Sequence, residues 1–502
     1  MKKLVFLRRS SQVFFLVLFI YILWSTTYPL KGLLPPDTFF KINPLIIFFT
    51  SISERMILPG IILAAGMLIL TLIFGRFFCG WICPLGSMID ICGLVNKKET
   101  SMGDRKDGLL RRIKFYILGF ISVFSFFGIQ IAWILDPMVI TARFISLNLI
   151  PSATLSIDRI SVFFIKRSNF YAPLYDFYRG LKASVLGIDA RYFPNSAVIL
   201  LFFLVICASA LVSKRLWCRS ICPLGALYSL VARFSLLRRV VSKCVKCMKC
   251  KSNCRMAAIK DNLDYLKGEC ILCMDCIYDC PVKKTAFRFR ADPAPGDKKD
   301  GVSRKQFLFL MALSFLSLGF RNRKRLDDGG KSGTVIRPPA ALAEEEFLNR
   351  CVRCGNCMKV CITNGLQPVM FESGFEGIWT PKLVPEIGYC EYKCTLCGNV
   401  CPTGAIPRIS LEQKKKTRLG LAEIDRSICI AWAENKECLV CEEHCPVSDK
   451  AIKVAEYKAG EKTVLRPYVD HRLCIGCGIC QNKCPVRPER AIKVSARKSD
   501  RT

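Results

Sequence analysis

Histidine is nearly absent from the sequence, and this absence limits the cofactors that the chain can hold. The 502 residues include two histidines, His444 and His471, both in the last third. A haem held by two histidines therefore has no ligands in the apolar segments, and no CxxCH motif is present for covalent haem attachment. We expect no haem, and we expect both histidines to lie in solvated loops.

Nucleotide-binding motifs are missing as well, and acidic residues are scarce. No GxGxxG follows a candidate strand and no Walker loop is present, so nothing signals nicotinamide, flavin or nucleotide. Asp and Glu number 40 against 74 Lys and Arg, for a net charge of +34. The basic residues flank apolar segments and are not interleaved with aromatics, which favours membrane lipid over nucleic acid as a partner. Electrons must enter from a quinol or a protein.

Long hydrophobic runs, in contrast, are prominent. Four of them are long enough to span a bilayer: Val13–Leu30, Met56–Gly75, Phe115–Leu135 and Ser196–Val212. Basic residues precede the first run and separate the second from the third, which predicts a multi-pass protein of the inner membrane with a cytoplasmic N-terminus. No cleavage site follows the first run, so we expect a retained anchor. A fifth run, Gln306–Phe320, is short for a span.

The 30 cysteines indicate metal ligands rather than disulfides, because thiols stay reduced on the cytoplasmic side. Two groups after the fourth run have the spacing CxxCxxCxxxC: Cys244, Cys247, Cys250, Cys254 and Cys270, Cys273, Cys276, Cys280. In two-cluster ferredoxins, three close cysteines bind one [4Fe-4S] cluster and the fourth binds the other. We therefore expect Cys280 to complete the first cluster and Cys254 the second.

Four further groups of cysteines follow in the last third of the chain. They are Cys351, Cys354, Cys357, Cys361; Cys390, Cys394, Cys397, Cys401; Cys429, Cys438, Cys441, Cys445; and Cys474, Cys477, Cys480, Cys484. The middle two open with wider gaps than ferredoxins have, so crossed ligation is expected without an assigned pairing. Structural zinc is the alternative, but zinc sites use two separated CxxC knuckles. We expect about six [4Fe-4S] clusters.

Six cysteines lie outside these groups, and four of them belong to a repeated motif. The stretches GRFFCGWICPLGS and KRLWCRSICPLGA end the second and fourth runs and share R[FL][FW]CxxxCPLG. Two such units around a pseudo-twofold axis would bring four thiols together: Cys79, Cys83, Cys218 and Cys222. These form either a redox or metal site, or a packed turn at the prolines. Cys92 and Cys207 are expected to pack in the core.

Two further features bear on electron entry and on topology. Quinol oxidation needs a proton acceptor, for which Gln130 and Asp136 are candidates; alternatively, Asp136 only forms a turn before Pro137. The stretch SRKQFL, beside the short fifth run, is similar to a twin-arginine export signal, with Lys305 in place of the second arginine. If this run crosses the membrane, the last domain is periplasmic; if it lies on the surface, the domain stays cytoplasmic.

These features predict four parts in the chain. They are a membrane domain (1–240), a two-cluster ferredoxin domain (241–292), a linker with the short apolar run (293–335) and a four-cluster ferredoxin domain (336–502). The expected fold is an α-helical membrane domain of four helices, with the fifth run as a further candidate, plus small α+β, βαβ-like ferredoxin lobes. The lobes have few apolar residues, so the clusters should hold them together.

The motifs resemble those of a known group of proteins. GRFFCGWICPLGS, WCRSICPLGAL and the ferredoxin pair behind them resemble NapH, a membrane iron–sulfur protein of periplasmic nitrate reduction, and the related MauN and NosR-type proteins. RPPAALAEEEFLNRCVRCGNCMKVC and the cysteine groups after it resemble NapG and MauM, which are exported four-cluster ferredoxins. The chain departs from the family pattern at Cys254 and Cys361, which lack a following proline, and at the Arg-Lys pair.

The resemblance implies a NapH-like part fused to a NapG-like part. Such a protein would oxidise quinol and relay electrons to a redox partner such as a periplasmic reductase system, as an electron-transfer subunit or a quinol dehydrogenase component. The MauM and MauN likeness implies a different role, electron donation during maturation of another metalloenzyme. A conduit fed by a cytoplasmic ferredoxin is a third possibility.

Overall fold

The computed structural model describes most of the chain and divides it into two compact units. The described residues are 2–30, 32–95, 103–167, 171–182, 191–242, 244–289, 335–459 and 462–496. Unit 1 comprises residues 1–23, 37–144 and 198–325, and unit 2 comprises residues 24–36, 145–197 and 326–502. The fifth apolar run and the export-like motif lie outside the described residues.

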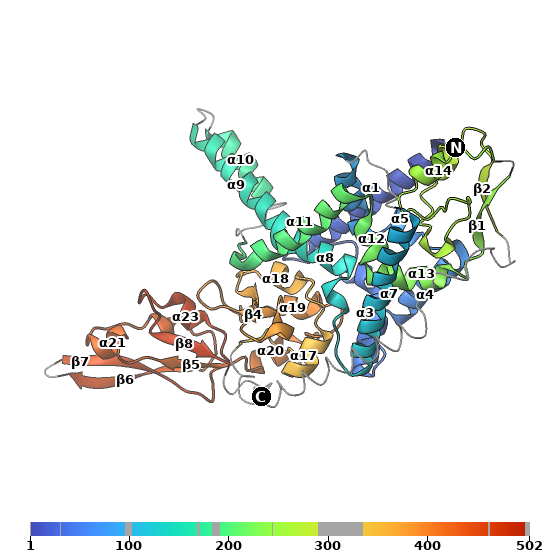
Figure 1. Cartoon of the computed structure of the whole chain (residues 1–502). Coiled ribbons are helices and arrows are strands. Elements are labelled where there is room, and N and C mark those ends of the chain that lie inside the picture. Colours follow the sequence, from blue (N-terminus) through green and yellow to red (C-terminus); the bar gives the residue numbers. More distant parts are fainter. Residues whose placement is uncertain are drawn as a thin grey trace. The chain divides into compact units, whose positions relative to one another are not determined.

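Most of unit 1 is helical (Figure 1). Its helices are α1 (Lys2–Ser25), α2 (Thr38–Lys41), α3 (Pro44–Glu54), α4 (Ile61–Phe74), α5 (Phe78–Trp81), α6 (Pro84–Cys92), α7 (Asp104–Phe126), α8 (Pro137–Phe144), α11 (Ala197–Val212), α12 (Leu216–Ser220) and α13 (Pro223–Ala232). Helix α7 packs against α3, α12 and α13, and α4 packs against α3 and α13. The two short helices that carry the repeated cysteine motif are therefore held inside a helical core.

Three helices in the described part of the chain are long and apolar enough to cross a membrane. They are Lys3–Ser25, Pro137–Arg167 and Pro194–Val212. The first and the last correspond to the first and fourth predicted runs. The second was not predicted, because charged residues such as Asp158 and Arg159 interrupt its apolar pattern. A helical membrane part is thus supported, with helices that differ from the predicted four.

The second and third predicted runs form shorter or interrupted helices. The second run yields α4, which has 14 residues. In the third run the helix α7 ends at Phe126, and the chain turns at Gly128, whose φ of +78° is a conformation that glycine adopts without strain. A single 3₁₀ turn, Ala132–Ile134, then leads to α8. The prediction overlooked this turn because the residues around it are apolar.

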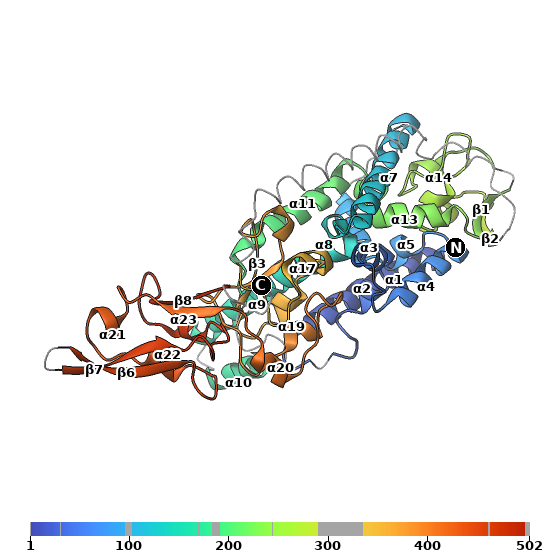
Figure 2. The same ribbon diagram turned by 90° about the horizontal axis from the view of Figure 1, so that it is seen from below.

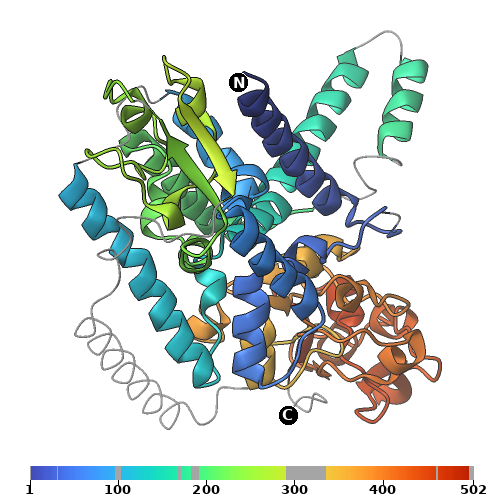
Figure 3. The ribbon, with the colours of Figure 1, turned by 90° about the vertical axis from the view of Figure 1, so that its right-hand side faces the viewer.

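The first ferredoxin lobe lies in unit 1 and is closed by a two-stranded sheet. Strand β1 (Leu237–Val241) precedes the first cysteine group, β2 (Thr285–Phe289) follows the second, and the two strands pair antiparallel (Figure 3). Two short helices, α14 (Lys249–Ser252) and α15 (Asp275–Tyr278), lie between them. The βαβ-like prediction is therefore wrong for this lobe, since a βαβ unit joins parallel strands.

Unit 2 holds the last ferredoxin domain. Its elements are α9 (Ile150–Arg167), α10 (Tyr171–Leu181), α17 (Glu344–Arg350), α18 (Asn356–Val360), β3 (Leu366–Pro368), β4 (Pro381–Leu383), α19 (Leu396–Asn399), α20 (Leu411–Lys416), β5 (Leu421–Ile424), α21 (Ile430–Ala433), α22 (Val440–Glu443), β6 (Ile452–Ala459), β7 (Lys462–Val469), α23 (Ile479–Lys483) and β8 (Ile492–Ser495). Strands β5 and β8 pair antiparallel around the last two cysteine groups, as β1 and β2 do in the first lobe. Between those groups, β6 and β7 form a long hairpin (Figure 2).

The core of the last lobe is built largely from its cysteines. Buried around Leu421, Ile452 and Ile492 are four thiols and a few alanines, with further cysteines packed against them. So small an apolar core has little area to bury, and metal ligation is the usual supplement in such lobes. The fold of the lobe thus depends on what its thiols bind.

Candidate metal centres

Both copies of the membrane motif fold in the same way. The first cysteine lies on a short helix, α5 or α12, and the second cysteine is the N-cap of the next helix, α6 or α13, with proline behind it. The caps Cys83 and Cys222 have nearly equal backbone angles, φ −60° and ψ 117° against φ −62° and ψ 113°. Proline at the first helical position fixes this geometry. The repeat in sequence is therefore a repeat in structure.

The four membrane thiols, which the repeat predicts to lie together, interact electrostatically across the two repeats. Cys83 interacts electrostatically with Cys79 and Cys218. Cys222 interacts in the same way with Cys218 and Cys79. All four side chains are buried, with exposed fractions of 4–7%. Their role as a redox or metal site stays a proposal.

Two buried arginines join the two repeats. Arg76, from the first repeat, donates from Nη2 to the carbonyl oxygen of Cys218 at 2.8 Å and from Nε to Sγ of Cys79 at 3.3 Å. Arg215, from the second repeat, donates from Nη1 to the carbonyl oxygen of Cys79 at 2.7 Å. This exchange is reciprocal, as a pseudo-twofold axis requires. The motif contained the signal, an arginine three residues before each first cysteine, but the sequence analysis gave these arginines no role.

The glycine of each CPLG stretch makes room for these arginines. A Cβ on Gly225 would overlap Nη2 of Arg76, and a Cβ on Gly86 would lie 3.5 Å from Nη2 of Arg215 and 3.0 Å from the carbonyl oxygen that this arginine contacts. Protein interiors tolerate little overpacking. The last residue of the motif is therefore a requirement of the arginine positions.

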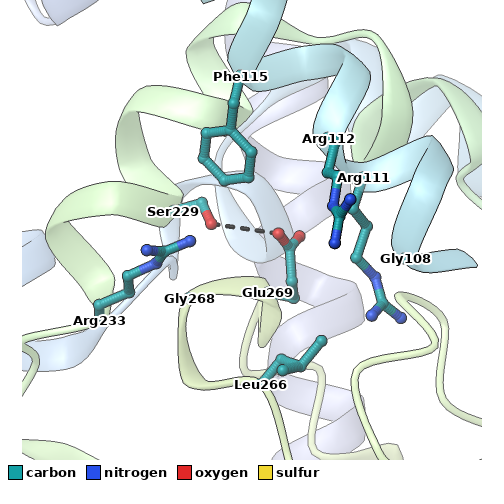
Figure 4. Close-up of a pocket in the computed structure, with 9 residues that line it drawn as sticks. All are labelled: Gly108, Arg111, Arg112, Phe115, Ser229, Arg233, Leu266, Gly268 and Glu269. Atoms are coloured by element: carbon teal, nitrogen blue, oxygen red, sulfur yellow. Dashed lines mark hydrogen bonds between the residues drawn. The ribbon is translucent and has the colours of Figure 1, made fainter. Parts of the chain in front are cut away.

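Arg76 is neutralised by a carboxylate of the first ferredoxin lobe. Glu269 accepts from Nη1 of Arg76 at 3.1 Å and from Nζ of Lys114 at 2.5 Å. It also accepts from the hydroxyl of Ser229 at 3.2 Å (Figure 4). Burial alone raises the pKa of a carboxyl, but the charges of Lys114 and Arg76 outweigh it and lower the pKa of Glu269 to about 2. Glu269 therefore stays ionised and ties helix α7 to the lobe.

Arg215 has the corresponding partner in its own helical core. Asp90 accepts from Nε and Nη2 of Arg215 at 2.8 and 2.7 Å and from Nε2 of Gln12 at 3.0 Å. Arg255 of the first lobe lies 3.2 Å from Asp90 and donates to Asp275 at 2.6 Å. A buried, two-pronged pair of this kind is costly to break on one side only.

The ligand loop of the first lobe rests directly on helix α5. The indole of Trp81 donates to the carbonyl oxygen of Leu272 at 3.0 Å. Gly80 faces the carbonyl of Ile271 so closely that a Cβ would overlap it. Since Ile271 and Leu272 lie between Cys270 and Cys273, the loop expected to bind a cluster is in contact with the membrane motif.

In the first lobe, the thiol of Cys254 interacts electrostatically with the second cysteine group, and its role as the crossed ligand stays a prediction. We call the set Cys254, Cys270, Cys273 and Cys276 centre B. Burial raises the pKa of Cys270 and of Cys276 to about 12, and the charge of Cys254 raises each of them further. Centre A is the set Cys244, Cys247 and Cys250, whose thiols interact. The assignment of Cys280 to centre A stays a prediction.

The last domain brings its cysteines together in four crossed sets. Three of the sets each line one pocket: centre C (Cys351, Cys354, Cys357 and Cys401), centre D (Cys361, Cys390, Cys394 and Cys397) and centre E (Cys445, Cys474, Cys477 and Cys480). Centre F is Cys429, Cys438, Cys441 and Cys484; burial raises the pKa of Cys441 to about 12, with the other three thiols adding to it. Each set takes one cysteine from a neighbouring group.

The donor sets fit iron–sulfur clusters. Four thiols around one cavity are the usual ligands of a [4Fe-4S] cluster. Across the residues that the structure describes, no three His, Cys, Asp or Glu side chains converge on a point that could hold one metal ion. Zinc needs such convergence, with Zn–S distances of about 2.3 Å, whereas a cube holds its thiolates on separate corners.

The remaining cysteines and the histidines lie away from these centres. Cys207 and Cys92, which had no partner motif, are hydrogen-bond partners of each other. The prediction that each simply packs missed this pairing, because they lie on helices far apart in sequence. His444 and His471 are both exposed, as expected.

Asp136 caps helix α8. Its Oδ1 accepts from the backbone N–H of Met138 at 3.0 Å and of Val139 at 2.9 Å, and its Oδ2 accepts from Asn43 at 2.8 Å. Gln130 donates to the hydroxyl of Thr50 at 3.1 Å. A carboxylate that accepts this many hydrogen bonds serves the helix, which favours the turn interpretation of Asp136.

The cysteine sets place the chain in a class, the ferredoxin-type electron-transport proteins with [4Fe-4S] domains. A family model described as "4Fe-4S binding domain" matches residues 56–100 and 196–244, which hold the two membrane motifs, and a second model with the same description matches residues 467–488. No solved structure matches the chain.

The curated relatives narrow the class. The ferredoxin-type protein NapG of Escherichia coli is 35% identical over 168 residues, which cover 32% of this chain and 71% of NapG. The methylamine utilization ferredoxin-type protein MauM of Methylorubrum extorquens is 34% identical over 167 residues, 32% of this chain and 73% of MauM. YccM of Escherichia coli, a proposed electron transport protein, is 24% identical over 269 residues, 52% of this chain and 64% of YccM. The chain belongs to the NapG and MauM family of ferredoxin-type proteins.

Proposed function

We propose that the chain is a membrane-bound quinol dehydrogenase component that passes electrons through [4Fe-4S] clusters to a redox partner. Each quinol becomes a quinone by giving up two electrons and two protons. The protons pass to water, and the redox partner takes the electrons. The thiols of centres A to F would hold the clusters, and the membrane thiols Cys79, Cys83, Cys218 and Cys222 are candidates for one further site. The clusters supply one-electron redox chemistry when bound.

The observation that carries this proposal is the linear order of the four centres in the last domain. Helices α18 and α19 each hold a ligand of one of the centres C and D, and a ligand of the other centre follows the helix: Cys357 and then Cys361, Cys397 and then Cys401. Helices α22 and α23 are arranged in the same way for centres F and E, with Cys441 and then Cys445, Cys480 and then Cys484, and both helix pairs are packed. Centres D and E meet where the backbone N–H of Cys390 donates to the carbonyl oxygen of Cys477 at 2.8 Å. The order is C–D–E–F, which suits electron transfer from one end of the domain to the other.

Helix α1 supports an assignment of membrane sides. It has 24 residues, so it is about 36 Å long and spans about 30 Å of hydrocarbon. Basic residues lie at its start, which favours a cytoplasmic N-terminus. Near this start, Arg8 lies 4.0 Å from Asp275 of the first lobe, which favours a cytoplasmic first lobe. The resemblance of the last domain to exported ferredoxins favours a periplasmic position for that domain.

Reporter fusions test this topology. Alkaline phosphatase fused after Thr502 should be active, since it folds only outside the cytoplasm, and a cytoplasmic fluorescent protein at the same position should be dark. A fusion after Phe289, behind the first lobe, should give the opposite pattern. A dark phosphatase fusion after Thr502 would put all six centres on one side and contradict the proposal.

Reduction by quinol tests the activity itself. The full chain, purified anaerobically in detergent, should show paramagnetic signals of reduced clusters within seconds of adding a menaquinol analogue. Dithionite provides the control, because it reduces clusters without any quinol site. Clusters that dithionite reduces and menaquinol does not would contradict quinol oxidation.

The likeness to MauM, a methylamine utilization protein, favours a second role in maturation of another metalloenzyme. In that role the chain would deliver electrons during assembly and would not sustain respiratory flux. A feed from a cytoplasmic ferredoxin is the third alternative, and reduction by a ferredoxin but not by menaquinol would favour it.

A further inference from the structure

A large cavity opens in unit 1 between the membrane helices and the first ferredoxin lobe. It measures about 470 Å³ and lies between the start of α1, the end of α6, the start of α12 and the cysteine loops of the lobe. Pockets that hold drug-sized ligands measure roughly 300–1000 Å³. The cavity therefore has room for an aromatic head group and the first part of a tail.

The floor of the cavity is made by the loops that carry the cluster ligands. Arg255, which lines it, follows Cys254 directly, and Asp275 precedes Cys276. Asp279, in the same lining, precedes Cys280. A molecule bound on this floor would contact residues that are adjacent in sequence to the cysteine ligands. No other domain would lie between the molecule and the ligand loops. Such a position suits an electron donor to the first lobe.

The opposite wall is apolar and reaches the membrane helices. Val5 and Phe6 of α1 line it together with Ile89 of α6 and Leu94 behind it. Phe6 and Leu94 remain 71% and 76% exposed. Phe6 lies in Lys3–Ser25, a helix long and apolar enough to cross a membrane, and exposed apolar side chains on such a helix face lipid. An apolar tail can therefore leave the cavity here without crossing water.

The charges of the floor are already paired. Asp90 accepts from Arg215 at 2.7 Å, and Asp275 accepts from Arg255 at 2.6 Å. In total, the lining holds four basic and three acidic side chains. This near balance does not select an anionic phosphate group, which Arg and Lys clusters recognise. It offers acceptors for hydroxyl groups and donors for carbonyl oxygens on a neutral molecule.

We propose that this cavity binds the head group of quinol at its charged floor, with the isoprenoid tail leaving past Phe6 and Leu94. The hydroxyls of quinol donate to the carboxylates, and the carbonyls of the product quinone accept from the arginines. This inference rests on the proposed function and names the place where its substrate binds.

A tryptophan at the mouth of the cavity tests the site. Leu94→Trp should fill the exit of the tail and raise the concentration of a menaquinol analogue with one isoprene unit that gives half-maximal cluster reduction by about tenfold or more. Ile91→Trp is the matched control, because Ile91 lies three residues before Leu94 at the end of α6, is 56% exposed and is absent from the lining. It should behave as the unchanged protein does. Dithionite should reduce the clusters equally in all three proteins.

The outcomes distinguish a failure of the proposed binding site from a failure of the proposed function. Equal quinol kinetics in Leu94→Trp and the unchanged protein would overturn the site, as would a bound phospholipid that only Leu94→Trp loses. If menaquinol reduces none of the proteins, the proposed function fails, and the site is then judged by photolabelling with an azido-menaquinone. Label on residues 5–9 or 89–94 that Leu94→Trp abolishes supports the cavity, and label elsewhere overturns it.

Discussion

Arg76→Met should destabilise the membrane part of the chain by about 3–5 kcal/mol, the cost of removing one partner from a buried ion pair. Arg76 is fully buried, and its guanidinium serves Glu269, Sγ of Cys79 and the carbonyl oxygen of Cys218. Methionine fills much of the same volume but donates nothing. Glu269 would keep Lys114 and Ser229, while the carbonyl of the second repeat would lose its buried donor.

Arg112→Met is the matched control for this prediction. Arg112 lies on α7 beside the Glu269 site (Figure 4) and is half-buried, and it has no hydrogen bond or ion pair with any residue that the structure describes. Its replacement should change stability by no more than about 0.5 kcal/mol. Thermal unfolding of both variants in the same detergent, followed by tryptophan fluorescence, gives the comparison. Equal melting temperatures would show that the reciprocal arginine contacts do not hold the repeats together.

The cysteine spacings predicted the groups well but their pairing only in part. In the first lobe both groups share one regular spacing, so the ferredoxin rule named Cys254 as the crossed ligand, and the structure places it beside Cys270 and Cys276. In the last domain the gaps before Cys394 and Cys438 are irregular. Which groups exchange ligands there depends on the packing of α18 on α19 and of α22 on α23, and a linear spacing does not contain that information.

The helical part was harder to predict because hydropathy and charge gave conflicting signals. Helix Pro137–Arg167 carries charged residues that broke the apolar pattern, yet two-thirds of its most apolar window is buried inside the protein. Buried Arg143, for example, lies over the ring of Trp133. The sequence analysis took charge as a sign of a surface position, so it treated the arginines of the core as loop residues. For the same reason it assigned no role to Arg76 and Arg215. A charged side chain indicates a surface position only where no partner is available to it inside the protein.

Serine substitutions of crossed ligands should reveal the pairing in the last domain. Cys361→Ser should remove the same cluster as Cys394→Ser, because both thiols line the cavity of centre D. Cys401→Ser should match Cys354→Ser, because these two belong to centre C. Each change should lower iron content by about four per chain. Electron paramagnetic resonance of the dithionite-reduced protein should then show one missing signal shared within each pair and different between the pairs.

The experiment distinguishes crossed from uncrossed ligation, because two cysteines of the same sequence group should lose different signals. Cys361 is the last cysteine of its group, and uncrossed ligation would make Cys361→Ser lose the signal that Cys354→Ser loses, which would contradict the pairing. Cys207→Ser is the control, since this thiol lies in helix α11 and contacts Cys92 rather than any centre. It should keep all of the iron and every signal. If the pairs behave as expected, α18 and α19 each hold a ligand of one centre and lead into a ligand of the other, an arrangement that suits electron transfer along the order C–D–E–F.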